Sequence, residues 1–138
     1  MGGYVETLES KGVLAFVPHG NSMWPFLKNG KQTVIIEKKP AQRLKPLDVV
    51  FYKRNDGAFV LHRIVQVIDG GYLTRGDSLF TIETISEESV FGVMQGFYKG
   101  KDFVYATNEK YLKKVEKWYK DTWLINLRKR IFHFFNKL

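Results

Sequence analysis

Three short segments of the chain contain the residue types that acyl-transfer chemistry requires, in the order nucleophile, base and acid. The first is Gly20-Asn21-Ser22-Met23-Trp24-Pro25, in which a serine stands among turn-forming residues. Serine is a poor nucleophile at neutral pH unless a base takes its proton in the transition state. Whether Ser22 is more than a turn residue therefore depends on the other two segments.

The second and third segments supply the base and the acid. His62 lies inside the longest predicted strand, and the ordinary pKa of imidazole lies close to neutral. Asp77 follows a hairpin turn and could accept a hydrogen bond from the imidazole, which would hold its tautomer. A backbone N–H of the tight turn at 20–22 could supply one oxyanion donor. This order of residues predicts a serine acyl-transfer site.

Each of these residues also has a simpler interpretation when taken alone. Ser22 and Asp77 are ordinary turn formers, and His62 could be a strand histidine with a structural partner. Arg63 follows His62, so its side chain should point to the opposite face of the strand and make a salt bridge or a surface contact. The case for chemistry depends on the three segments occurring together, in order.

The elements that must position these residues are mostly predicted strands. Short apolar and β-branched runs are bounded by Gly, Pro, Asn and Asp, a pattern typical of strands joined by tight turns. The predicted strands cover residues 13–17, 33–37, 48–52, 58–68, 72–75, 90–98 and 102–105. A short helix is expected over 4–11, ended by Gly12. We therefore expect a mainly β fold, with an antiparallel β catalytic core at residues 1–107.

The pattern becomes helical after Asn108, which can cap the helix that follows. Residues 109–138 carry nine of the 22 Lys and Arg residues but three of the 14 acids. At helical spacing the apolar residues of 123–138 fall on one face and the polar residues on the other. The pattern predicts a basic amphipathic C-terminal helical tail at residues 108–138.

This tail suggests a partner with negative charge. With two tryptophans and a basic face, residues 118–138 suit the headgroup layer of an anionic membrane. The apolar face could instead pack on the β body or on another subunit. Nucleic acid is disfavoured, because the aromatic residues lie with the apolar face and are not interleaved with the cations as stacking platforms.

Composition excludes several other classes of site. The absence of cysteine excludes disulfides, thiolate catalysis and cysteine-based zinc sites. The three histidines are scattered, so neither a metal nor another cofactor is expected. The first residues do not form a signal peptide, and no run approaches the roughly 18 apolar residues of a membrane-spanning helix. We expect a cytoplasmic or peripheral membrane location.

The ordered segments resemble the conserved boxes of the type I signal peptidases and, more distantly, those of the self-cleaving repressors with the same β fold. Residues 22–25 resemble the Ser-Met-x-Pro nucleophile box. Residues 48–50 resemble the strand that follows it, with Leu47 in place of the usual glycine. His62-Arg63-Ile64 resembles the base box of the archaeal and endoplasmic-reticulum branch, in which histidine replaces the bacterial lysine. Residues 74–77 resemble its Thr-Lys-Gly-Asp box.

The resemblance implies a signal-peptidase-type catalytic core with Ser22 as nucleophile and His62 as general base. It places four further residues in the nucleophile and oxyanion box, namely Gly20, Asn21, Met23 and Pro25. Many relatives have a serine at the position of Gly20, whose hydroxyl helps to bind the oxyanion; Asn21 is a possible substitute. In relatives the acid box usually continues into Asn residues and a second aspartate, whereas here residues 78–83 follow, ending in Glu83. The acid is therefore Asp77 or Glu83, and we favour Asp77.

The sequence as a whole thus predicts a serine endopeptidase of the signal peptidase type, a hydrolase that cleaves a leader or signal-type peptide. The peptide would bind in an extended form as an added strand on a sheet edge. The alternative is a catalytically inactive peptide- or membrane-binding module on the same fold. Repressor-style self-cleavage is a further possibility, although only about twenty residues precede Ser22.

Overall fold

The computed structural model describes residues 3–136, with side chains described as far as Thr122. The elements in chain order are α1 (Tyr4–Lys11), β1 (Val13–Phe16), β2 (Val34–Lys38), β3 (Val49–Lys53), β4 (Phe59–Ile68), β5 (Gly71–Arg75), β6 (Ile82–Ser86), a 3-10 turn (Glu87–Ser89), β7 (Val90–Lys99), β8 (Asp102–Tyr105) and α2 (Glu109–Asn136). The prediction of a mainly β fold with a C-terminal helix is confirmed.

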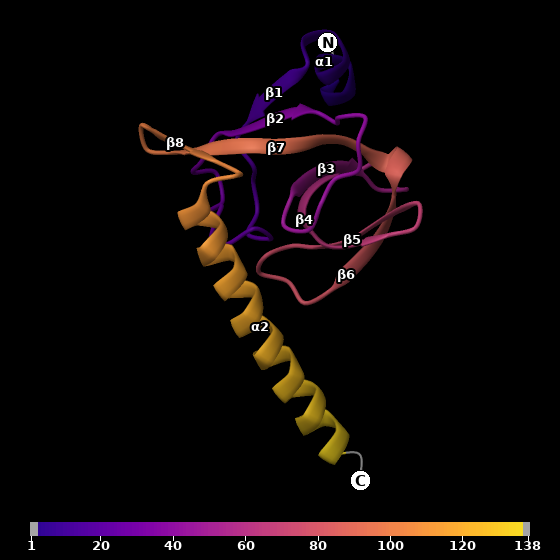
Figure 1. Cartoon of the computed structure of the whole chain (residues 1–138), viewed down its shortest axis with the longest axis vertical. Helices are drawn as coiled ribbons and strands as arrows, with labels where there is room; N and C mark the ends of the chain where they lie inside the picture. The colour runs from indigo at the N-terminus through magenta and orange to yellow at the C-terminus, as the bar shows by residue number, and fades with distance from the viewer. Residues whose placement is uncertain (1–2, 137–138) are drawn as a thin grey trace.

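The strands form one antiparallel sheet in the order β1-β2-β7-β3-β4-β5-β6, with β8 paired to β7 (Figure 1). The chain reaches β7 late, yet β7 lies between β2 and β3 and joins the two halves of the sheet. β1 and β6 are the two ends of this path and have one neighbouring strand each. The strand that carries His62, β4, is thus held on both sides, by β3 and β5.

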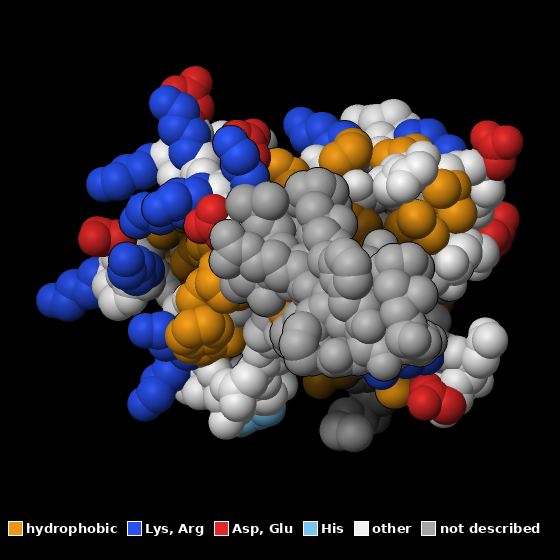
Figure 2. All heavy atoms as spheres, turned by 90° about the horizontal axis from the view of Figure 1, so that it is seen from below, with side chains coloured by type: hydrophobic (Ala, Val, Ile, Leu, Met, Phe, Trp, Pro, Cys, Tyr) orange, Lys and Arg blue, Asp and Glu red, His pale blue; other side chains and the backbone are white. Residues whose placement is uncertain are grey.

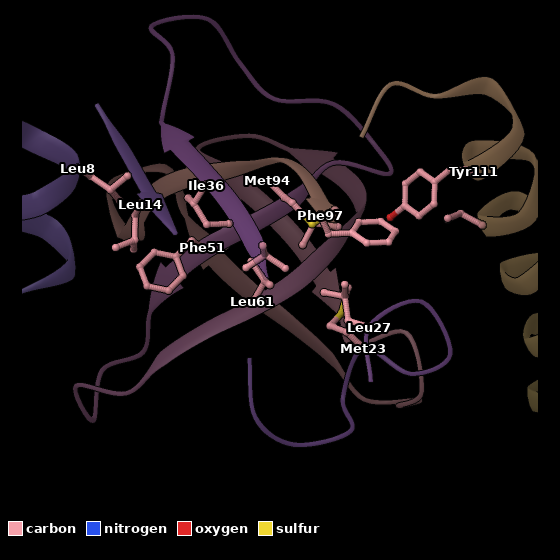
Figure 3. Close-up of a cluster of buried hydrophobic side chains, with 13 residues drawn as sticks. Leu8, Leu14, Met23, Leu27, Ile36, Phe51, Leu61, Met94, Phe97 and Tyr111 are labelled. Atoms are coloured by element: carbon pink, nitrogen blue, oxygen red, sulfur yellow. The ribbon is translucent and has the colours of Figure 1, made fainter. Parts of the chain in front are cut away.

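Two hydrophobic clusters pack on opposite faces of β3. Residues 49–52 are therefore all buried, and apolar and polar residues do not alternate along this strand. Val49 and Phe51 belong to the first cluster, whereas Val50 and Tyr52 belong to the second. The first cluster also receives residues from α1, β1, β2, β7 and the loop that carries Ser22 (Figure 3). The loop that carries Ser22 is therefore anchored in the same core as the strands.

The C-terminal helix begins as the sequence predicts. The side chain of Asn108 accepts a hydrogen bond of 2.9 Å from the backbone N–H of Tyr111, a standard N-cap contact. Tyr111 and Val115 are buried in the first cluster, so the start of α2 is part of the body. Trp118 and Tyr119 still contact the loop after β5, and further along the chain α2 extends away from the sheet (Figure 1). The predicted apolar face of residues 123–138 lies outside the described side chains.

β6 was not predicted from the sequence. It is short, mostly exposed and polar, and it forms because its backbone pairs with β5 in register, Thr74 opposite Glu83. A strand at the end of a sheet has a neighbouring strand on one side only. Its other edge faces water, so its sequence needs no continuous apolar run. Within the described residues, none of the helices combines the length and the apolar character needed to span a membrane.

Candidate active site

Ser22 lies in the loop between β1 and β2, and two kinds of contact fix this loop. Met23 and Leu27 are each 4% exposed and pack into the first hydrophobic cluster on either side of a turn. Within the turn, the N–H of Leu27 binds the carbonyl oxygen of Met23 at 2.9 Å, and the N–H of Gly20 binds the side chain of Asn29 at 2.7 Å. The buried Met23 of the nucleophile box therefore holds Ser22 at the surface of the core.

The loop after β5 is fastened to the Ser22 loop. The N–H of Ser78 donates to the carbonyl oxygen of Ser22 at 3.0 Å, and its hydroxyl donates to that of Asn21 at 2.6 Å. A Cβ placed on Gly76 would lie 2.8 Å from the Ser22 carbonyl oxygen and 3.1 Å from Nε2 of His62. Glycine is required at position 76 because the Ser22 backbone and the imidazole meet there.

His62 reaches this point from β4 with a buried ring, since the residue is 4% exposed. Within the described part of the chain, no hydrogen bond joins the Ser22 hydroxyl to the imidazole. Catalytic hydrogen bonds are often long in a free enzyme and shorten when substrate binds. Both residues line the same cleft, and Nε2 is the ring nitrogen on the side of Gly76 and the Ser22 loop.

The other ring nitrogen of His62 faces a tyrosine. Nδ1 lies 3.3 Å from the hydroxyl of Tyr52, which donates a hydrogen bond of 2.7 Å to Oε2 of Glu83. The same hydroxyl lies 3.2 Å from Oγ1 of Thr74. Tyr52, Glu83 and Thr74 come from three different strands, β3, β6 and β5. Tyr52 thus connects the imidazole to a carboxylate.

These contacts determine the tautomer of the neutral imidazole. Burial raises the pKa of the Tyr52 phenol, so the phenol keeps its single proton, and the short bond to Glu83 uses that proton. The oxygen of Tyr52 can then only accept from His62, which requires the proton on Nδ1. Burial also lowers the pKa of His62, which keeps the ring neutral. Nε2 is left with a free lone pair on the side of the serine, as a general base requires.

Glu83 is held in its ionised form by an arginine. Arg54 forms a salt bridge to Oε1 and donates from Nε to Oε2 at 3.2 Å. These bonds, with that from Tyr52, lower the pKa of Glu83. The charge of Glu83 raises the pKa of His62 and the charge of Arg54 lowers it, and both effects are smaller than that of burial.

Asp77, the acid favoured from the sequence, is placed with Arg63 and not with His62. Both carboxylate oxygens accept hydrogen bonds of 2.8 Å from Arg63, and Oδ1 also accepts one of 2.5 Å from Tyr119. The two side chains of the ion pair are 1% and 0% exposed. The expected salt bridge of Arg63 is present, but it occupies the carboxylate that was expected to orient the histidine. The structure thus connects Glu83, the other acid considered, to the imidazole.

Helix α2 contributes to the same buried network. Tyr111 accepts a hydrogen bond of 2.9 Å from Arg63, and the indole N–H of Trp118 donates one of 2.6 Å to the carbonyl oxygen of Asp77. These contacts were not predictable from the sequence, because nothing in the helical pattern indicates which aromatic residues face the loop. Tyr52 was also missed, although strand register offers a signal: Val50 pairs with His62, and Tyr52 is two residues further on the same face.

Leu47 stands where the family resemblance leads one to expect glycine, and its backbone explains that preference. Its φ of +77° lies in the left-handed region, which glycine adopts without steric cost. Its N–H binds the carbonyl oxygen of Ile64 at 2.8 Å, and its own carbonyl oxygen accepts a hydrogen bond of 3.0 Å from Arg63. These bonds fix the start of β3 to the strand that carries His62.

Ser22 and His62 line a cleft of about 460 Å³. Its other lining residues are mostly apolar, from α1, β1, β3, β4 and the loops, and include Tyr4, Phe16, Phe51, Phe59 and Leu79. β1 is an end strand and has a free edge. The pairing of β4 with β5 begins at Arg63, so residues 59–62 of β4 have no partner strand on that side. Two strand edges without a neighbouring strand therefore border the cleft. An extended peptide could add to either edge.

No protein-family model matches the chain, and no curated protein matches it. Among the residues whose side chains are described, no cluster of His, Asp or Glu is suited to hold a metal ion. The case for a function therefore rests on the geometry of the cleft.

Proposed function

We propose that the protein is a serine endopeptidase in which Ser22 is the nucleophile and His62 the general base. The observation that carries the proposal is the orientation of His62. Its Nδ1 faces Tyr52 and Glu83, and its Nε2 lies beside Gly76 and the Ser22 loop. A buried, neutral imidazole with this tautomer is the form that can accept the proton of a serine hydroxyl.

In the proposed reaction, Oγ of Ser22 attacks the carbonyl carbon of the scissile bond while Nε2 of His62 takes its proton. The imidazolium then donates that proton to the departing amine, and an acyl-enzyme remains. Water, deprotonated by the same Nε2, hydrolyses the ester and restores the serine. Glu83, acting through the Tyr52 hydroxyl, stabilises the imidazolium in both steps, because its negative charge favours the protonated ring.

The oxyanion would bind to backbone N–H groups of the turn at Ser22. Gly20 has no side-chain donor, and its own N–H already binds Asn29. The N–H groups of Asn21 and Ser22 are the remaining donors of this turn. Backbone donors of this kind, fixed before the reaction, stabilise the negative oxygen without reorganisation.

The substrate class that fits is an extended peptide. It would lie in the cleft between the edge of β1 and residues 59–62 of β4, and main-chain hydrogen bonds to either edge would fix its direction. That this peptide is a leader or signal-type segment is an inference from the resemblance of the boxes alone.

Incubation of the protein with a proteome-derived peptide library, followed by mass spectrometry of new termini, tests the proposal. We expect cleavage by the wild-type protein and by Ser10→Ala, whose serine lies on α1. Ser22→Ala and His62→Ala should give no product above background. Equal product from the wild type and Ser22→Ala would end the assignment of the nucleophile.

The second candidate is a peptide-binding module without catalysis. It is favoured by the lack of a hydrogen bond between the Ser22 hydroxyl and His62 in the described structure, together with the open strand edges. In that case the wild type and Ser22→Ala would retain library peptides equally on an affinity column, and neither would release new termini.

A further inference from the structure

A second concave surface lies between the β7–β8 hairpin, the start of α2 and the loop after Ser22. It is a groove of about 510 Å³. Four lysines line it, namely Lys28, Lys99, Lys110 and Lys114, and four aromatic residues join them, namely Phe26, Phe97, Phe103 and Tyr111. No acidic residue lines the groove, and within the described part of the chain none of these lysines forms a salt bridge. We call it the basic groove.

The four lysines come from three separate parts of the chain and are all exposed. Figure 2 shows Lys and Arg side chains gathered on the side of the molecule that carries the β7–β8 hairpin, next to hydrophobic side chains. Like charges brought together without counter-charges repel one another and weaken the folded state. An anionic partner removes that repulsion, so the groove is suited to a negatively charged ligand.

The aromatic residues indicate which anionic partner fits. Tyr111 packs edge to face on both Phe26 and Phe97, at centroid distances of 5.8 and 5.4 Å, and Phe97 and Tyr111 are buried. Their faces are thus not available to stack on nucleic-acid bases. Three exposed amphipathic aromatic residues neighbour residues of the lining: Tyr98 and Tyr105 contact Phe103, and Trp24 directly precedes Pro25. Tyrosine, tryptophan and lysine together are typical of the headgroup layer of a membrane.

We propose that the basic groove docks the protein on a bilayer of anionic phospholipid, with lipid phosphates between the lysines and the neighbouring exposed aromatic residues at the headgroup level. This surface differs from residues 118–138, the segment expected from the sequence to contact a membrane, since it is built from the folded body and the first turns of α2. Lys28 lines both the basic groove and the Ser22 cleft. Docking would therefore hold the mouth of the cleft beside the membrane, where it could receive a membrane-bound peptide.

Co-sedimentation with vesicles tests the proposal on the full chain. The probes are vesicles of phosphatidylcholine alone and of phosphatidylcholine with phosphatidylglycerol. The groove variant is Lys99→Gln, Lys110→Gln and Lys114→Gln combined. The control is Lys11→Gln, Lys45→Gln and Lys53→Gln combined, which removes the same charge from exposed lysines that do not line the groove. Both proteins keep residues 118–138 unchanged, so the difference between them measures the groove.

We expect the wild type and the control to bind the anionic vesicles, and binding to phosphatidylcholine alone to be weak. The groove variant should lose affinity on the order of 100-fold, because each lysine near an anionic surface contributes roughly five-fold. Equal binding by both triple variants would overturn the proposal, as would a preference of the groove for a single-stranded oligonucleotide over the vesicles. Ser22→Ala should bind vesicles as the wild type does, so a failure of the proposed peptidase function would leave this result unchanged.

Discussion

Two arginine–carboxylate pairs lie on either side of His62, and they differ in burial. The side chains of Arg63 and Asp77 are 1% and 0% exposed, whereas those of Arg54 and Glu83 are 42% and 26% exposed. The buried pair binds Tyr111 and Tyr119 of α2 and fixes the loop that carries Gly76. The exposed pair binds Tyr52 and through it His62.

This difference separates a structural role from a chemical one. A buried ion pair costs desolvation energy when it forms. Removal of either partner then leaves the other as an uncompensated buried charge. A partly exposed pair contributes little to stability, but its carboxylate can still act on a buried imidazole through one intervening hydroxyl. We therefore expect substitutions in the first pair to act on folding and those in the second on catalysis.

The largest effect should come from Asp77→Asn. The substitution leaves the charge of Arg63 buried without a counter-charge, so the free energy of unfolding should fall by about 3–5 kcal/mol. Urea unfolding followed by tryptophan fluorescence measures it. Replacing both partners with apolar residues, as in Arg63→Met with Asp77→Leu, should cost less than Asp77→Asn alone. A stability of Asp77→Asn within 1 kcal/mol of wild type would contradict the structural role.

The next effect should be on activity. Glu83→Gln removes the charge that stabilises the imidazolium, and Tyr52→Phe removes the hydroxyl that transmits it. Each should lower kcat/KM for a cleaved library peptide by about 10- to 100-fold, and the double variant should lose little more than either single one.

The stability of Glu83→Gln should change by less than about 1 kcal/mol, because the pair is partly exposed. Glu87→Gln is the matched control, since Glu87 also pairs with an arginine, Arg43, away from His62. If Glu83→Gln and Glu87→Gln are equally active, the chemical role of the second pair is excluded.

A smaller effect is expected where α2 meets the buried pair. Trp118→Phe keeps the ring packing but loses the hydrogen bond from the indole to the carbonyl oxygen of Asp77. The free energy of unfolding should fall by about 1 kcal/mol. Trp24→Phe is the control, because Trp24 is 46% exposed and should change stability by less than about 0.5 kcal/mol. Equal stabilities of the two variants would show that the hydrogen bond of Trp118 does not stabilise the loop.

The smallest effect should appear in the pH dependence of kcat/KM. The general base must be neutral, so activity falls as the pH drops below the pKa of His62, which burial lowers. Glu83 raises this pKa, so Glu83→Gln should move the acidic limb to lower pH. Arg54 lowers the pKa, so Arg54→Gln should move the limb to higher pH. Asp56→Asn, on the neighbouring turn, serves as control. Shifts in the same direction for both variants would contradict the arrangement around His62.

Much of the fold was predictable from local pattern. The helix over 4–11, the cap at Asn108 and most strands follow from periodicity, glycine and turn residues, which act over a few positions. β6 was not predictable in this way, because most of its residues are polar or exposed and it forms by pairing with β5.

The site was predictable in part. The order of boxes drew attention to Ser22 and His62, and the structure has both lining one cleft. The roles of the acids could not be found from sequence order. Asp77 and Glu83 follow the histidine at similar separations, and only the packing of β3, β5 and β6 brings Glu83 to Tyr52 and Asp77 to Arg63.

The sequence by itself determined the residue types of the site, because the chemistry of serine, imidazole and carboxylate is a property of the side chains. It also determined that Met23 directly follows the serine, whereas the approach of Gly76 to Ser22 depends on the tertiary structure. Only the tertiary structure decided which carboxylate serves the histidine. Hydrogen bonds act over about 3 Å, and which groups come within that distance depends on strands far apart in the chain.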